Sequence, residues 1–241
     1  MSLNETIAHL RILTQTTPLY QHIGKVCKVS GLLVESQGPQ CALGDLVSIV
    51  SPNDEALIDA EVIGFHDTHV LLMPLGENNN IAYGCRVVLN NYKQSVPIGD
   101  GLRGRIIDAF GAPMDKLGPL HCQRIRHFNS AVPKALERPI ITRPFITSIK
   151  AIDTFIPMGL GQRMGIFAGS GVGKSTLLGM LAKHSEADIN VLALIGERGR
   201  ELNEFIHNDL GEEGLKKSVI VVATSDQAAL RIRAAFLATY I

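Results

Sequence analysis

The residues from Met164 to Thr176 have the types and spacing of a phosphate-binding loop. Glycines let the backbone bend so that several N–H groups point at one anion, and the start of a following helix adds the positive end of its dipole. Lys174 can then reach the β- and γ-phosphates of a nucleoside triphosphate, and the Ser175 hydroxyl can ligate Mg²⁺. The expected phosphate-binding residues are Gly169, Ser170, Gly171, Val172, Gly173, Lys174, Ser175 and Thr176.

The elements around the loop must hold it in place. Met164–Phe167 is a short apolar run that predicts a buried strand, and the residues after Ser175 predict a buried helix. Strand, glycine loop, lysine, hydroxyl and helix in this order form the P-loop arrangement, in its relaxed form because Ala168 replaces the first glycine of the strict pattern. A dinucleotide-binding loop would need glycine where Lys174 stands, so the pattern favours a nucleoside triphosphate over NAD.

A second chemical group follows the next predicted strand. Ile189–Ile195 and Val219–Ala223 read as strands separated by a helical pattern, which implies a parallel sheet with ligands at the carboxyl ends of its strands. Glu197 and Arg198 lie just after the first of these strands. In isolation such a charged run is more often a solvated turn. One strand after a P-loop, Glu197 is instead our candidate for activating water, and Arg198 for sensing the γ-phosphate.

The first part of the chain has another pattern. Six short apolar runs between residues 23 and 89, separated by turn-forming residues, predict a small antiparallel β-barrel. Residues 20–96 carry four basic and eight acidic side chains, a net charge of −4 that is unfavourable for nucleic-acid binding. We expect an N-terminal arm at 1–22, the barrel at 23–95, a connector at 96–145 and a partial P-loop ATPase domain at 146–241. The expected fold class is therefore α/β, with a RecA-like parallel sheet after the barrel.

Several stretches resemble one family, the type III secretion and flagellar export ATPases, which are related to the catalytic subunit of rotary ATP synthases. The resemblance is carried by residues 161–175 and 195–201, by the upstream stretch 104–115, and by residues 64–65 and 72–75. It covers nearly the whole chain from about Gly24 onward. It implies an ATP- and Mg²⁺-dependent motor that couples hydrolysis, together with proton motive force, to the unfolding and export of protein subunits.

By motif, the resemblance assigns phosphate binding to 169–176, Mg²⁺ binding to Ser175, and catalytic roles to Lys174, Glu197 and Arg198. It also implies a homohexameric ring in the cytoplasm, peripheral to the inner membrane and without a transmembrane segment. The implied partners are stalk and regulator proteins, the export gate and chaperone–substrate complexes, with no nucleic acid.

Members of the family continue well beyond the position where this sequence stops, so we expect a truncated chain that binds nucleotide weakly and hydrolyses it poorly. Three other interpretations remain open on the sequence. The first is a rotary or vacuolar-type ATPase subunit, and the second is a hexameric RNA helicase of the transcription-terminator type. The third is a non-catalytic nucleotide-binding fragment that joins full-length rings.

Overall fold

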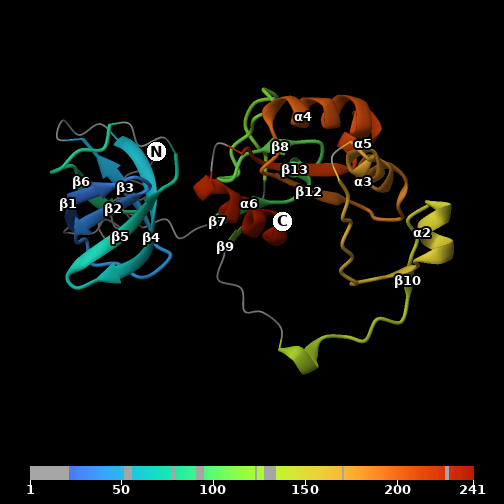
Figure 1. Cartoon of the computed structure of the whole chain (residues 1–241), viewed down its shortest axis with the longest axis horizontal. Helices are drawn as coiled ribbons and strands as arrows, with labels where there is room; N and C mark the ends of the chain where they lie inside the picture. The colour runs from blue at the N-terminus through green and yellow to red at the C-terminus, as the bar shows by residue number, and fades with distance from the viewer. Residues whose placement is uncertain are drawn as a thin grey trace, which may run out of the picture. The chain divides into compact units, whose positions relative to one another are not determined.

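The computed structural model describes residues 22–51, 56–76, 80–90, 95–122, 124–127, 134–169, 171–225 and 228–241. The chain forms two compact units, residues 1–93 and 94–241. Figure 1 shows the elements of both along the chain. The expected N-terminal arm lies outside the described residues, except for its last position. Within them, no helix is long and apolar enough to cross a membrane.

The first unit is a closed six-stranded barrel, as the six short apolar runs predicted. Its strands neighbour one another in the order β1-β2-β5-β4-β3-β6, and all pairs are antiparallel. Every second side chain points inward, so seven large aliphatic side chains are at most 1% exposed. The strands are β1 (Ile23–Ser30), β2 (Leu33–Gln37), β3 (Leu46–Val50), β4 (Ala56–His66), β5 (His69–Pro74) and β6 (Arg86–Leu89). The seven core side chains are Val26, Val34, Val47, Ile49, Val62, Leu72 and Val87.

The second unit contains a three-stranded parallel sheet in the order β12-β13-β8. Its strands are β8 (Ile106–Ile107), β12 (Asn190–Ile195) and β13 (Ser218–Ala223), and the central β13 is fully buried. The expected strands at 189–195 and 219–223 are thus present. The segment expected to be a connector contributes the short strand β8, which pairs in parallel with β13.

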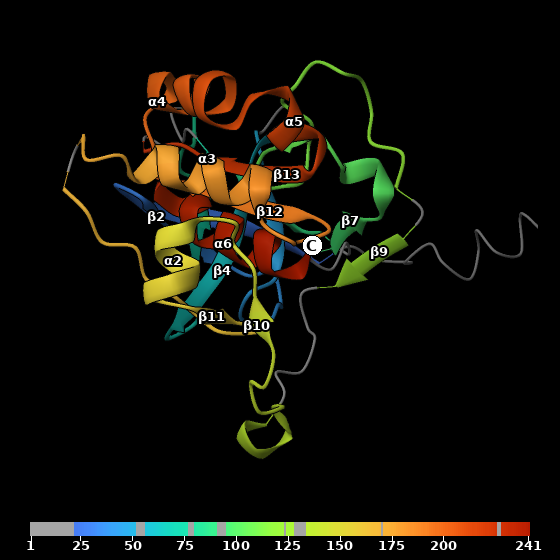
Figure 2. The ribbon, with the colours of Figure 1, turned by 90° about the vertical axis from the view of Figure 1, so that its right-hand side faces the viewer.

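Helices cover both faces of this sheet (Figures 1 and 2). On one face lie α3 (Lys174–His184), α4 (Gly199–Glu204), the π-helical turn η3 (Phe205–Leu210) and α5 (Gly211–Lys216). On the other lies α6 (Ala228–Tyr240). The core of the first face joins Ala182 of α3 to Phe205, Ile206 and Leu210 of η3 and to Ile220 and Val222 of β13.

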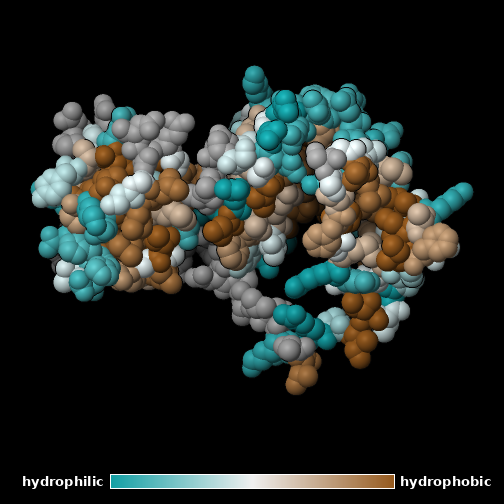
Figure 3. Space-filling view, viewed as in Figure 1, coloured by the Kyte–Doolittle hydropathy of each residue, from teal (hydrophilic) through white to brown (hydrophobic). Residues whose placement is uncertain are grey.

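Shorter elements make up the rest of the second unit. The strands β7 (Ser95–Ile98) and β9 (Arg124–His127) pair with each other, as do β10 (Pro144–Phe145) and β11 (Met158–Gly159). The helices are η1 (Asp100–Leu102), η2 (Ala135–Glu137) and α2 (Lys150–Phe155). Apolar surface remains around α2, on the right of Figure 3, where Phe155 is 82% exposed.

An ion pair and a cation–π contact fix the turn that follows β8. The Arg105 guanidinium donates to both carboxylate oxygens of Asp115, at 2.7 and 2.9 Å, and both side chains are nearly buried. This contact, with the N–H groups of Ile106 and Leu117, lowers the pKa of Asp115 to about 2. The Arg233 guanidinium lies 4.9 Å from the Phe110 ring centre and donates to the Ala109 carbonyl. The turn at 108–115 is therefore held against both β8 and α6.

One predicted element is wrong. The apolar run Met164–Phe167 is not a strand, because residues 162–169 have no regular structure and Phe167 is 96% exposed. A strand needs a neighbour for its backbone groups, and no described strand runs beside this segment. The helix after it is present, but it is only partly covered: Gly179 and Ala182 are its buried residues.

Candidate functional site

The predicted phosphate loop leads directly into α3. Gly173 is the N-cap of α3 with φ +92°, and Gly171 has φ +76°. Both are left-handed conformations that residues with a Cβ adopt at a cost, which explains glycine at these positions. Ser170, between Gly169 and Gly171, lies outside the described residues.

The space beside the loop glycines is open. A Cβ built on Gly169, Gly171 or Gly173 would meet no described atom within 4 Å. The N-cap glycine has no side chain to cap the helix, and the first turn, which begins Lys174, Ser175, Thr176, has no acidic residue. The N–H groups at the start of α3 are therefore available to an anion, and the glycine cradle fits a phosphate group. Val172 is 67% exposed at the tip of the loop.

The structure brings Lys174 and Glu197 together, although they are 23 positions apart. The Lys174 ammonium Nζ lies 3.7 Å from Oε1 of Glu197, with the two side chains 45% and 39% exposed. Glu197 is the second residue after β12, so the end of this strand and the start of α3 meet at one edge of the sheet. Water and a phosphate can both reach this pair, because each side chain is partly exposed.

Arg198 points elsewhere. Its Nη1 lies 3.8 Å from Oε1 of Glu201 in the first turn of α4, and its side chain is 68% exposed. Ser175 and Thr176 lie exposed in the first turn of α3. Of the predicted site residues described, the structure thus places Lys174 and Glu197 in contact, and it leaves Arg198 in a local pair on the neighbouring helix.

The turn that carries Glu197 is held by groups that the sequence pattern did not single out. Gly196 has φ +79° and donates its N–H to the Ala223 carbonyl at 2.7 Å. The Ser225 N–H donates to the Glu197 carbonyl at 3.3 Å. A Cβ on Gly196 would lie 3.7 Å from Cδ of Arg231, so the arginine side chain covers this turn. The glycine after a strand was a usable signal in the sequence, whereas nothing there connected Arg231 to the turn.

Two family models match the two units. The model described as the ATP synthase alpha/beta family, beta-barrel domain, matches residues 26–89. The model described as the nucleotide-binding domain of the same family matches residues 148–241. The second range contains the glycine loop, Lys174 and Glu197.

Curated relatives match over most of the chain. A protein named flagellum-specific ATP synthase, from Bacillus subtilis, is 49% identical over 230 residues, which are 94% of this chain and 52% of the relative. A type 3 secretion system ATPase from Xanthomonas euvesicatoria is 40% identical over 227 residues, which are 94% of this chain and 51% of the relative. The chain therefore spans about half the length of these relatives.

Solved structures of a type III secretion ATPase also match most of the chain. The assembled ATPase EscN from the type III secretion system of enteropathogenic E. coli matches with a TM-score of 0.77 and 40% identity, over 90% of this chain and 52% of that one. EscN in complex with its central stalk EscO matches with a TM-score of 0.79 and 41% identity. The barrel, the parallel sheet and the glycine loop, together with these agreements, show that the chain belongs to the ATP synthase alpha/beta family, among relatives named flagellum-specific ATP synthase and type 3 secretion system ATPase.

Proposed function

We propose that this chain is the nucleotide-binding part of an ATP-hydrolysing motor subunit of the flagellar or type III protein export apparatus. The single observation that carries the proposal is the pairing of Lys174, at the start of α3, with Glu197, at the end of β12, beside an open glycine loop. The names of the relatives at 49% and 40% identity support export as the process.

Each residue of the site has a role in this proposal. The N–H groups of 169–176 and the Lys174 ammonium bind the phosphates of ATP, and Ser175 supplies a hydroxyl ligand for Mg²⁺. The bound Mg²⁺ would neutralise charge on the phosphates. Glu197 orients a water molecule and accepts its proton, and Arg198 turns from Glu201 toward the terminal phosphate.

We further propose that the isolated chain binds nucleotide weakly and hydrolyses it poorly. The segment before the loop is irregular and mostly exposed, with only Met164 and Ile166 half-buried, so the loop is not fixed by a strand at its start. Catalysis by positioned groups is lost when those groups are held loosely.

The wider assignments of the family are proposals as well. We propose a homohexameric ring that associates with a stalk protein, the export gate and chaperone–substrate complexes in the cytoplasm at the inner membrane. The assembled EscN structures and the EscN–EscO complex support self-assembly and a stalk partner. The acidic barrel, with net charge −4 over residues 20–96, argues against the RNA helicase alternative.

The experiment measures ADP and ATP binding by equilibrium dialysis, and phosphate release, with Mg²⁺ present. Lys174→Ala should abolish nucleotide binding, and Lys150→Ala, which removes the same charge from exposed α2, should not. Glu197→Gln should retain binding and lose residual turnover. Nucleotide binding that survives Lys174→Ala unchanged would overturn the assignment of the site.

A further inference from the structure

α6 carries two arginines that reach different neighbours. Arg231 and Arg233 are two positions apart, and successive residues of an α-helix are rotated by about 100° around its axis. The two side chains therefore leave the helix on nearly opposite sides. Arg233 is 6% exposed, whereas Arg231 is exposed. One helix thus connects the parts of the unit that these two side chains contact.

The Arg233 side chain holds α6 on the turn that follows β8. Its Nε donates to the Ala109 carbonyl at 3.1 Å, and its guanidinium lies 4.9 Å from the centre of the Phe110 ring. This turn is itself fixed, because the Asp108 carboxylate accepts from the N–H groups of Phe110 and Ala112, at 2.8 Å each. β8, which leads into the turn, pairs with β13. The position of α6 is therefore set by a well-ordered part of the sheet.

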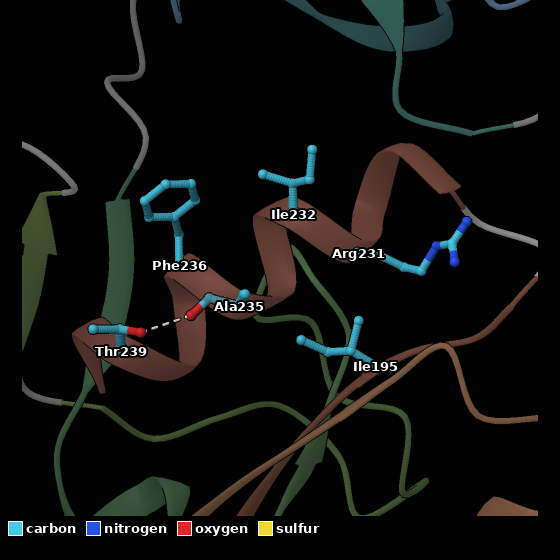
Figure 4. A pocket seen from close by; sticks show the side chains of 6 residues that line it. All are labelled: Ile195, Arg231, Ile232, Ala235, Phe236 and Thr239. Atoms are coloured by element: carbon cyan, nitrogen blue, oxygen red, sulfur yellow. Dashed lines mark hydrogen bonds between the residues drawn. The ribbon is translucent and has the colours of Figure 1, made fainter. Parts of the chain in front are cut away.

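The Arg231 side chain lies over the turn that carries Glu197. A Cβ built on Gly196 would be 3.7 Å from Cδ of Arg231 and 3.9 Å from its Nη1, so the end of the stem and the guanidinium both face this glycine. Figure 4 shows Arg231 projecting from α6 on a different side from Ile232. Arg231 also lines the same pocket, of about 420 Å³, as Ile195, the last residue of β12. The side chain therefore lies where the strand ends and the Glu197 turn begins.

The turn needs such a contact, because its other restraints act on the backbone. The Gly196 N–H donates to the Ala223 carbonyl at 2.7 Å, and the Glu197 carbonyl accepts from the Ser225 N–H at 3.3 Å. The Glu197 carboxylate lies 3.7 Å from the Lys174 ammonium, which is an ion pair beyond hydrogen-bond distance. Gly196, at φ +79°, brings no side chain of its own to the turn. The direction of the carboxylate therefore depends on how firmly the turn is held.

We propose that Arg231 is a positioning residue for Glu197. The stem of Arg231 packs on the bare backbone of Gly196 and limits the movement of the turn, and α6 holds the stem in place. The proposal rests on the proposed function, because the carboxylate that Arg231 positions is the group proposed to activate water. A reacting group displaced by about 1 Å can cost on the order of 100-fold in rate, so a packing contact at this turn acts on catalysis.

Hydrogen exchange measured by NMR tests the contact without any turnover. In Arg231→Ala the stem is lost, and the Gly196 amide should exchange at least about fourfold faster, which corresponds to the packing of one methylene group. The Ile220 amide, which donates to the Arg105 carbonyl inside the sheet, should not change. Arg231→Met retains an unbranched stem without the charge, and it should restore the slow exchange of the parent chain. Arg138→Ala, which removes an exposed arginine after η2, is the matched control and should have no effect.

Phosphate release from ATP with Mg²⁺ tests the consequence for catalysis. In Arg231→Ala, the residual kcat should fall, by up to about 100-fold, at unchanged KM, and Arg231→Met should restore it. Equilibrium dialysis with ADP should give the same affinity for the parent chain and both variants, since the proposed contact is with the turn and not with the phosphates.

The outcomes separate this role from the proposed function. Unchanged exchange of the Gly196 amide in Arg231→Ala overturns the positioning role while ADP binding by the parent chain leaves the nucleotide site standing. Faster exchange at an unchanged kcat makes the contact merely structural and also overturns it. Arg231→Met that behaves like Arg231→Ala, or a loss of ADP affinity in both, assigns the effect to the charge and overturns the packing. A parent chain that binds neither ADP nor ATP overturns the proposed function itself.

Discussion

Replacing Glu197 with glutamine should raise the affinity for ADP, because the carboxylate competes with phosphate for the Lys174 ammonium. The two charged atoms are 3.7 Å apart, and the side chains are 45% and 39% exposed. Ion pairs with this exposure contribute about 0.2–1 kcal/mol. Release of Lys174 from the pair should therefore tighten ADP binding by about 1.4-fold to about fivefold.

The assay is a titration with ADP and Mg²⁺ at low and high ionic strength. The gain should shrink at high salt, since screening weakens the pair in the parent chain. Glu201→Gln is the matched control: it removes the same charge from the Arg198 pair and leaves the Lys174 pair intact. Equal effects of Glu197→Gln and Glu201→Gln would mean that net charge acts, and would refute the competition.

Other positions give sharper structural tests. Gly173→Ala puts a side chain at φ +92°, which should lower the free energy of unfolding by about 1–2 kcal/mol and place a Cβ beside the proposed phosphate site. ADP binding in equilibrium dialysis should therefore fall, whereas the control Gly199→Ala should leave it unchanged. Gly179→Ala places a Cβ 2.6 Å from the Asp209 carbonyl oxygen, and urea unfolding should show a loss of about 1–3 kcal/mol; an unchanged midpoint would contradict this packing. Asp115→Asn should lower the free energy of unfolding at neutral pH by about 2 kcal/mol, since the folded pKa is about 2 against an ordinary 3.8. That stabilisation is complete above pH 3.8 and is lost as the pH falls through 2, so parent and variant should converge there, and a pH-independent difference would contradict it.

The barrel was predictable because its information is local. Alternation along Leu46–Val50 and His69–Met73 places every second side chain inside, and the turn residues between the runs mark the ends of the strands. The pairs β2–β5, β3–β6 and β1–β6 join strands that are not consecutive, so the sequence pattern alone did not give them. The glycine loop was predictable for a related reason: positive φ at Gly171 and Gly173 is a backbone demand that only glycine meets cheaply. In both cases the residue type itself reports the conformation.

The strand predicted at Met164–Phe167 is absent, because local sequence does not determine whether a segment has a pairing partner. Its composition suits a strand, but a strand exists only where a neighbour accepts its hydrogen bonds, and that neighbour is not a property of the segment. Arg231 shows the same limit in the site. It reaches the Gly196 turn only because α6 crosses β12, 35 positions later in the chain.

The Gly196 turn and the segment before the glycine loop are held to different degrees. The backbone of Gly196 and Glu197 is hydrogen-bonded to the Ala223 carbonyl at the end of β13 and to the Ser225 N–H just after it, so the sheet holds this turn in place. Lys174 is fixed by α3, which packs on η3, while the loop before it is tied to no described strand. The Glu197 side of the site is thus held by the sheet, whereas the segment that leads into the glycine loop is not paired with any described strand. If phosphates bind at the glycine loop as proposed, their binding also has to order this segment, so we expect affinity for nucleotide, more than the position of Glu197, to limit the activity of this chain.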